Sequence, residues 1–161
     1  MKKIILLFFV VLSTGIWAQT DTICGSIPYK DGRVCYEGVV QTNKLTAESL
    51  YSNAKIWIAN NFGSAKSVIQ TDISNSSLVV KGILKIDGYT TYNFTLTLQF
   101  KDYRYKYTLT DIVYHFMSVE HPAEEQPFMI SCVESTVKEF NDYFCQFLNR
   151  VNNGIIKDND W

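Results

Sequence analysis

The alternation of apolar and polar residues is most regular between Thr91 and Phe116. Between Tyr92 and Phe100 the even positions are apolar and the odd positions are polar. From Tyr103 to Leu109 the apolar residues occupy the odd positions instead. Alternation with a period of two, in aromatic and β-branched residues, is typical of strands with one buried and one solvent-facing surface. The stretch therefore predicts a β-hairpin at the centre of an antiparallel sheet.

The two apolar sets share one face of this hairpin only if the connecting loop has an even length. A two-residue type I′ turn would need a positive φ at Lys101, which a lysine resists. We therefore expect a four-residue loop from Lys101 to Arg104. Near Asp111 the apolar set moves to the even positions of Ile112 to Phe116. This change of phase indicates a β-bulge or the end of strand pairing.

Helical spacing predicts a helix between an N-cap at Thr46 and a stop at Gly63. Its buried stripe holds Leu50, Ala54, Trp57, Ile58 and Phe62. The other expected elements are strands over Arg33–Thr42, Ser67–Thr71 and Ser77–Ile86, a loop over Ser118–Pro127 and a final helix over Glu134–Val151. Matching of the apolar faces puts Gly82 opposite a large aromatic residue such as Phe94, for which a glycine makes room.

The predicted order is therefore strand, helix, four strands, helix. Two amphipathic helices and a one-sided sheet make an α+β fold, a single two-layer domain with a curved antiparallel sheet and both helices on one face. We divide the chain into a signal peptide (residues 1–18), a loose lead-in segment (19–32), the α+β domain (33–155) and a C-terminal tail (156–161).

The N-terminus has the pattern of a secretory leader. Lys2 and Lys3 precede an apolar run from Ile4 to Leu12, and Ala18 supplies a small residue at a cleavage position. The apolar run is too short to span a bilayer, so we expect no transmembrane segment after cleavage. The protein is therefore predicted to be exported and to be periplasmic, outer-membrane-associated or secreted.

The charge of the chain is nearly balanced, with 15 Lys and Arg residues against 16 Asp and Glu residues. Nucleic-acid-binding domains carry a basic patch or stripe, which this sequence lacks, so we expect no nucleic-acid partner. Ten Tyr, ten Phe and three Trp residues supply a large aromatic content. Most of these rings are expected to fill the core of the sheet.

Four cysteines follow the leader, and an exported chain can form disulfides. Cys24 and Cys35 flank a Pro- and Gly-containing turn, so they are the pair expected to bond if any does. The final helix would separate Cys132 from Cys145 by roughly 20 Å, which is beyond bridging range. We therefore expect Cys132 and Cys145 to be unpaired. The alternative is that all four thiols are free.

His115 and His121 are the two histidines of the chain. With Asp111, Glu120 and Cys132 they could be imagined as a metal site, but their spacing matches no established ligand pattern. A triad of Ser118, His115 and Asp111 is equally constructible, yet no Gly-x-Ser-x-Gly elbow is present. Glu120, Glu124 and Glu125 are expected to be solvated loop residues. The sequence therefore predicts no metal, no cofactor and no enzyme.

Three segments carry a family resemblance: Leu50 to Trp57, Phe62 to Gln70 (FGSAKSVIQ) and Lys101 to Tyr105. In these segments the chain resembles a family of exported Gram-negative bacterial proteins, known as a domain of unknown function with a TATA-binding-protein-like fold. The resemblance covers Arg33 to Tyr114, and family members often have glycine where this chain has Tyr103. It implies the element order given above and no activity. DNA binding does not follow, because the DNA-binding saddle needs two repeats and apolar wedges.

The solvent-facing side of the predicted sheet is rich in threonine and cations. Its candidate binding residues are Lys81, Lys85, Thr95, Thr97, Gln99, Arg104, Lys106 and Thr108. An exposed sheet face or edge is a common docking platform. We therefore predict a non-catalytic binding module that uses this face or an edge, with an envelope protein, a glycan or a lipid as its partner. The alternative is a small hydrolase that uses His115 or His121.

Overall fold

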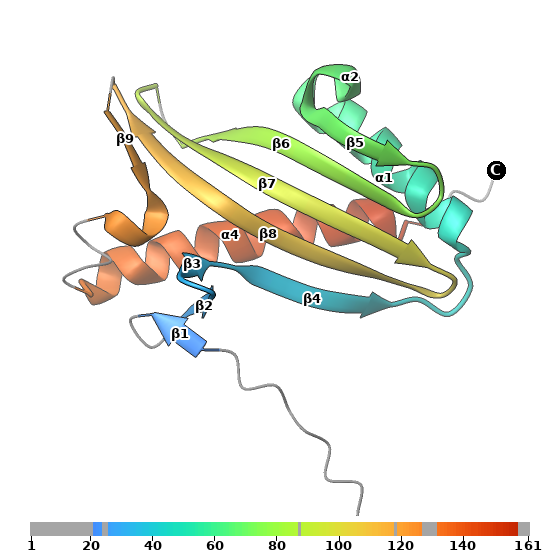
Figure 1. Ribbon diagram of the computed structural model, residues 1–161, viewed down its shortest axis with the longest axis horizontal. Coiled ribbons are helices and arrows are strands. Elements are labelled where there is room, and N and C mark those ends of the chain that lie inside the picture. Colours follow the sequence, from blue (N-terminus) through green and yellow to red (C-terminus); the bar gives the residue numbers. More distant parts are fainter. Residues whose placement is uncertain (1–20, 24–25, 87, 118, 127–131, 158–161) are drawn as a thin grey trace, which may run out of the picture.

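The computed structural model describes residues 21–23, 26–86, 88–117, 119–126 and 132–157. Its main sheet is antiparallel and has the strand order β4-β8-β7-β6-β5, with β9 also paired to β8. These strands are β4 (Tyr36–Gln41), β5 (Ile69–Ile73), β6 (Ser77–Lys85), β7 (Thr90–Lys101), β8 (Arg104–Phe116) and β9 (Val119–Pro122). Figure 1 shows the long strands β6, β7 and β8 side by side, with α4 running behind them.

The helices are α1 (Ala47–Phe62), α2 (Ala65–Val68), η1 (Ala123–Glu125) and α4 (Glu134–Ile155). The long helices α1 and α4 cover the same face of the sheet and contact each other. A separate small sheet consists of β1 (Asp21–Ile23), β2 (Ile27–Lys30) and β3 (Arg33–Val34). This arrangement confirms the predicted α+β fold, in which both amphipathic helices lie on one side of an antiparallel sheet.

The core lies between α1, α4 and the helix-facing side of the sheet. Leu96 and Leu98 of β7 are fully buried there, and Ile58 of α1 and Phe144 of α4 are fully buried from the opposite side. Thr46 caps α1 as predicted, because its Oγ1 accepts a hydrogen bond of 3.2 Å from the backbone N–H of Ser49. Burial of these apolar side chains supplies the main driving force that holds the two layers together.

The hairpin between β7 and β8 has an even-length loop, as predicted, but the loop has two residues instead of four. Lys101 pairs with Arg104, so Asp102 and Tyr103 alone connect the strands. Tyr103 adopts a φ of 65°. Two tertiary hydrogen bonds hold it there: its N–H donates to Leu45 O, and its carbonyl accepts from Thr42 N. The expected resistance of a bulky side chain to positive φ is therefore overcome by contacts outside the hairpin.

The change of apolar phase near Asp111 marks a β-bulge, as the sequence indicated. Asn93 pairs with Val113 and Thr95 pairs with Thr110, so β8 has one more residue than β7 in this interval. Asp111 takes a φ of 52° at the irregularity. Pairing continues beyond the bulge to the end of β8, which keeps Tyr114 and Tyr92 on the same face of the sheet.

Two glycines allow close contacts in the core. Gly82 of β6 pairs with Phe94, as predicted, and a Cβ at Gly82 would overlap the Phe94 ring and lie 3.0 Å from Phe62. Gly154 lies inside the last turn of α4, although the sequence placed it beyond the helix. A Cβ at Gly154 would overlap the Trp57 ring of α1. Both glycines therefore make room for aromatic rings.

Other segments differ from the prediction. The lead-in segment is not loose, because β2 and β3 pair and Ile27 is fully buried. The segment after α1 forms the short helix α2 before β5 begins at Ile69. Part of the expected Ser118–Pro127 loop is strand β9 and helix η1. The predicted signal peptide and most of the predicted C-terminal tail lie outside the described residues.

The cysteines correct the predicted pairing. Cys35 is a free thiol, 7% exposed between β3 and β4, so the expected Cys24–Cys35 bond is wrong. Cys145 is free and exposed, as predicted. Cys132 is disulfide-bonded, although we expected it to be unpaired. The argument from helix rise excluded only a bond from Cys132 to Cys145, and Cys132 precedes α4. Cys24 lies outside the described residues.

Candidate functional site

The sheet surface that faces away from α1 and α4 is here called the open face. Paired residues in antiparallel strands point to the same face, so the register assigns its members. Thr95 pairs with Lys81 and Thr110, Thr97 with Thr108, and Gln99 with Lys106. All eight residues proposed from the sequence therefore lie on this face: Lys81, Lys85, Thr95, Thr97, Gln99, Arg104, Lys106 and Thr108.

The predicted residues nevertheless fall into separate groups along the open face. Gln99, Arg104 and Lys106 line a hollow of about 560 Å³ near the β7–β8 turn, here called the turn hollow. Lys81 and Lys85 instead line a cleft of about 670 Å³ at the edge of β6, here called the edge cleft. Threonines of β7 and β8 lie between them and pair across the strands. The predicted residues thus line two separate concave regions, which a polar strip joins.

Apolar and cationic side chains meet in the turn hollow. Val39 of β4 and Ile73 of β5 each expose 55% of their surface there. Lys101 and Arg104 also line the hollow, and neither forms an ion pair with any described residue. Exposed apolar groups beside unneutralised cations are typical of a surface that associates with a partner.

Lys106 differs from these two cations because it has a local partner. Its Nζ lies 2.9 Å from Glu37 Oε2, and Lys30 Nζ lies 3.0 Å from Glu37 Oε1. Hydrogen bonds from Lys106 and Lys30 hold the pKa of the Glu37 carboxyl below its usual range. Glu37 therefore remains ionised at neutral pH and offsets part of the positive charge, which leaves Lys101 and Arg104 as the groups best able to attract an anion.

The two histidines do not form a common site. Tyr114 pairs with His121, and His115 pairs with Glu120, so the two rings point to opposite faces of the β8–β9 ladder. His115 Nδ1 lies 3.1 Å from Glu120 Oε1. The other ring nitrogen, Nε2, is buried and has no hydrogen-bond partner among the described residues. No described nucleophile therefore completes a catalytic set at His115, and Ser118 lies outside the described residues.

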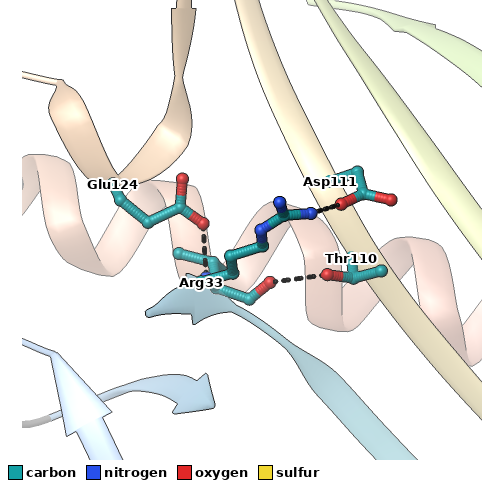
Figure 2. Close-up of polar contacts among 5 residues, drawn as sticks. Arg33, Thr110, Asp111 and Glu124 are labelled. Atoms are coloured by element: carbon teal, nitrogen blue, oxygen red, sulfur yellow. Dashed lines mark hydrogen bonds and ion pairs between the residues drawn. The ribbon is translucent and has the colours of Figure 1, made fainter. Parts of the chain in front are cut away.

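Asp111, the third member of the imagined triad, has a structural partner. Figure 2 shows the Arg33 guanidinium against the Asp111 carboxylate and Glu124 against the backbone of the β3 strand. The Val34 N–H donates to Glu124 Oε1, and the Thr110 hydroxyl donates to the Val34 carbonyl over 3.5 Å. These contacts fasten β3 to the bulge of β8 and to η1. Asp111 and Glu124 thus connect the small sheet to the main one.

Within the part of the chain that the structure describes, no group of three or more His, Cys, Asp or Glu side chains is placed to hold a metal ion. No helix in the described ranges is both long and apolar enough to cross a membrane.

A family model described as a domain of unknown function (DUF4468) with TBP-like fold matches residues 36–115. This segment contains β4, α1, α2 and β5, all of β6 and β7, and nearly all of β8. Residues 36–115 form a DUF4468 domain. The predicted resemblance to a domain of unknown function with a TATA-binding-protein-like fold is thereby confirmed, and the DUF4468 domain includes both ends of the open face. No curated protein matches the chain.

Two solved structures share the fold of this DUF4468 domain. A DUF4468 family protein from Bacteroides ovatus superposes with a TM-score of 0.65 at 13% identity, covering 86% of this chain and 95% of its own. A TBP-like protein from Parabacteroides distasonis superposes with a TM-score of 0.56 at 17% identity, covering 81% of this chain and 98% of its own. At these identities the likeness extends to the fold alone.

Sequence reasoning missed residues that complete the two concave regions. Lys101 continues the polar alternation of β7, but we assigned it to a loop. Trp57 was assigned to a buried stripe, whereas it is only partly buried and lines the edge cleft. Arg150 lies on the polar side of α4, where the helical pattern alone gives no sign that it faces the edge of a sheet. Only the packing of the helices against β6 reveals these positions.

Proposed function

We propose that this protein is an exported, non-catalytic binding module that holds an acidic protein surface against its open face. The observation that carries the proposal is the turn hollow. There, two cations without ion-pair partners among the described residues lie beside two exposed β-branched side chains. A protein partner is favoured over a glycan because the hollow offers aliphatic contacts. Sugar-binding surfaces usually stack aromatic rings against the sugar, and Phe100 and Tyr105 at this hollow are buried.

Electrostatics support an acidic partner. Lys101 and Arg104 are adjacent across the strand pair, so their side chains project together from the open face. Opposite charges on two proteins increase the association rate and select against wrong partners. Exposed Val39 of β4 and Ile73 of β5 lie on the two edge strands beside the hollow and would supply apolar area to such an interface.

Export is supported by two independent features. Residues 1–18 have the charge and hydropathy pattern of a signal peptide. Cys132 is in a disulfide, and disulfides persist mainly in oxidising compartments outside the cytosol. The partner is therefore expected among envelope or secreted proteins. The mature chain should begin at Gln19, which mass spectrometry of the protein recovered outside the cytosol would check.

Site-specific photo-crosslinking tests the binding proposal. A photoreactive residue at Thr97, in the middle of the open face, should crosslink the full chain to an acidic envelope protein. A photoreactive residue at exposed Gln146 of α4 serves as the control for the opposite side of the molecule. The Lys101→Glu/Arg104→Glu variant should abolish the Thr97 product, because it reverses the charge of the hollow.

A matched charge-reversal variant distinguishes a local effect from a change in net charge. Lys138→Glu/Lys157→Glu alters the same number of cations at exposed positions in and after α4. This variant should retain the Thr97 crosslink. A product that survives Lys101→Glu/Arg104→Glu, or that forms equally well from Gln146, would contradict binding at the open face.

The hydrolase alternative has a separate test. Purified protein would be screened against ester, peptide and glycoside substrates, alongside His115→Ala and His121→Ala variants with unchanged folding by circular dichroism. A turnover that either substitution removes would show that the protein is an enzyme and would end the non-catalytic proposal. We expect no such turnover, because the histidines point to opposite faces.

A further inference from the structure

The strand β6 is an interior strand over only part of its length. Its partner β5 pairs with Ser77 to Val80, whereas β7 pairs with β6 from Ser77 to Lys85. In Figure 1, β5 accordingly lies beside one half of β6, and α2 precedes it. No described strand pairs with Lys81–Lys85 on the side away from β7. This half of β6 is therefore an edge, and an exposed sheet edge can pair with another strand.

The direction of the backbone groups along this edge follows from the hydrogen bonds at the two ends of β6. Ser76 O accepts from Phe100 N, and Ile86 N donates to Thr90 O, so even-numbered residues direct their backbone groups toward β7. Because the direction alternates along a strand, the backbone groups of Lys81, Ile83 and Lys85 point away from β7, toward the unpaired edge of the sheet. The Tyr143 hydroxyl donates to Lys85 O on that side over 3.4 Å. An added strand would find backbone donors and acceptors at alternate residues.

Aromatic rings from the helix layer form the floor of the edge cleft. Trp57 and Phe62 of α1 and Phe147 of α4 line it, with ring centroids 5.9 Å and 6.0 Å from Trp57. Phe147 is almost fully buried, while Trp57 and Phe62 are only partly buried. A large apolar side chain that entered from the edge would therefore cover ring surface that is now exposed to solvent.

The charges around the cleft all have one sign. Lys81 and Lys85 project from the open face above the edge, and Arg150 of α4 lies below it. No acidic residue lines the cleft, and these three cations form no ion pair with a described residue. The cleft therefore offers complementary charge to an acidic ligand.

We propose that the edge cleft binds an extended acidic peptide segment, which adds to the main sheet as a strand along Lys81–Lys85. Alternate side chains of a strand point to opposite faces, so the ligand should alternate in character. Apolar side chains would contact the aromatic floor, and acidic side chains would lie beside Lys81 and Lys85 on the open face. The backbone of the ligand supplies affinity, and the alternation supplies specificity. This site is separate from the turn hollow.

Fluorescence anisotropy with the full chain tests the proposal. The probe is a labelled peptide that alternates glutamate with valine or phenylalanine. A control peptide of the same composition has its glutamates in one block, so that no register satisfies both faces. A second control carries N-methyl groups on all its amides, so neither of its edges can donate hydrogen bonds to a strand. We expect binding of the first peptide and a loss of at least about tenfold in affinity for each control, because edge pairing needs both features.

Variants of the protein locate the site. Lys81→Glu/Lys85→Glu should weaken binding of the alternating peptide by about tenfold or more, because it turns complementary charge into repulsion. Ile83→Pro removes a backbone N–H that points to the unpaired edge, and it leaves the pairing of β6 with β7 intact. It should weaken binding similarly, and circular dichroism would check its folding. The matched Lys138→Glu/Lys157→Glu variant should bind the peptide as the natural chain does.

The possible outcomes distinguish this proposal from the proposed function. Loss of peptide binding in Lys81→Glu/Lys85→Glu, with normal binding in Lys101→Glu/Arg104→Glu, would support a separate edge site whatever the open face does. Equal binding of all three peptides would overturn strand addition. Absence of peptide binding would overturn the proposal that the edge cleft binds a peptide. Self-association of the chain that Ile83→Pro abolishes would also overturn it, and would assign the edge to another copy of this chain.

Discussion

The contact between Gly82 and Phe94 allows a sharp prediction about the core. Glycine inside a strand is normally unfavourable, so replacement by alanine would usually stabilise a protein by about 0.5–1 kcal/mol. At Gly82, however, an added Cβ would overlap the Phe94 ring and lie 3.0 Å from Phe62 Cε1. Gly82 is buried, and Phe94 is only 2% exposed, so the Phe94 ring cannot move into solvent. We therefore expect Gly82→Ala to destabilise the protein.

The magnitude follows from two opposing contributions. Overpacking of a close-packed core costs about 1–3 kcal/mol, because neighbouring side chains must leave their preferred rotamers. Subtraction of the favourable backbone contribution leaves a net loss centred near about 1 kcal/mol, with about 2.5 kcal/mol as its upper bound. Urea unfolding followed by circular dichroism would measure this loss as a lower midpoint at unchanged slope. Gly88→Ala is the matched control, because a Cβ at Gly88 would meet nothing within 4 Å.

A double-mutant cycle shows whether Phe94 is the cause. In a Phe94→Leu background the smaller side chain should accept the new methyl group, so Gly82→Ala should then cost less. We expect a coupling of at least about 1 kcal/mol between the two substitutions, as is usual for residues in contact. If Gly82→Ala stabilised the protein, or if its cost were the same in both backgrounds, the close approach of β6 and β7 side chains would be wrong.

Three further predictions concern tyrosines and thiols. Burial raises the pKa of Tyr92, so above the ordinary tyrosine pKa of about 10 the unfolded chain loses this proton more easily than the folded chain. The contribution of Tyr92 to stability should therefore be constant below about pH 10 and fall at higher pH. Tyr92→Phe should reduce this fall, as urea titrations at several pH values would show. In native protein Cys145 is exposed and should react with a thiol reagent before Cys35, although burial raises the pKa of its thiol and slows the reaction. Cys35 should react only after unfolding and Cys132 only after reduction, as peptide mapping would show. Tyr103→Gly should increase the free energy of unfolding by about 0.5 kcal/mol or more, because glycine accepts positive φ without steric cost. The increase would appear as a higher urea midpoint.

The regular strands could be predicted because their physical basis is local. The period-two pattern of β7 and β8 records which side chains face the core, and the change of phase at Asp111 records the bulge. The same reasoning aligned β6 with β7 well enough to place Gly82 opposite Phe94. It also assigned every candidate binding residue to the open face, because face assignment depends only on register.

The errors occurred where distant segments decide the outcome. A two-residue loop with Tyr103 at positive φ is unfavourable in an isolated hairpin, but backbone bonds to Leu45 and Thr42 stabilise it here. Ile27 looked like part of a loose lead-in, yet it is fully buried in the core. The disulfide state of Cys132 likewise depends on which segment lies nearby, and spacing along the chain does not supply that information.

The edge cleft shows why a correct list of residues did not reveal a binding site. The sequence predicted a strand over Ser67–Thr71, whereas α2 occupies 65–68 and delays the start of β5 to Ile69. Only Ile69–Ile73 then remains to pair with β6, and at least one residue of this pairing is irregular. If residues 65–68 extended β5 instead of forming α2, they would pair with residues 81–84 and cover most of this edge. The short helix therefore exposes the edge, and α1 and α4 place their aromatic rings beneath it, so the site follows from where one strand stops.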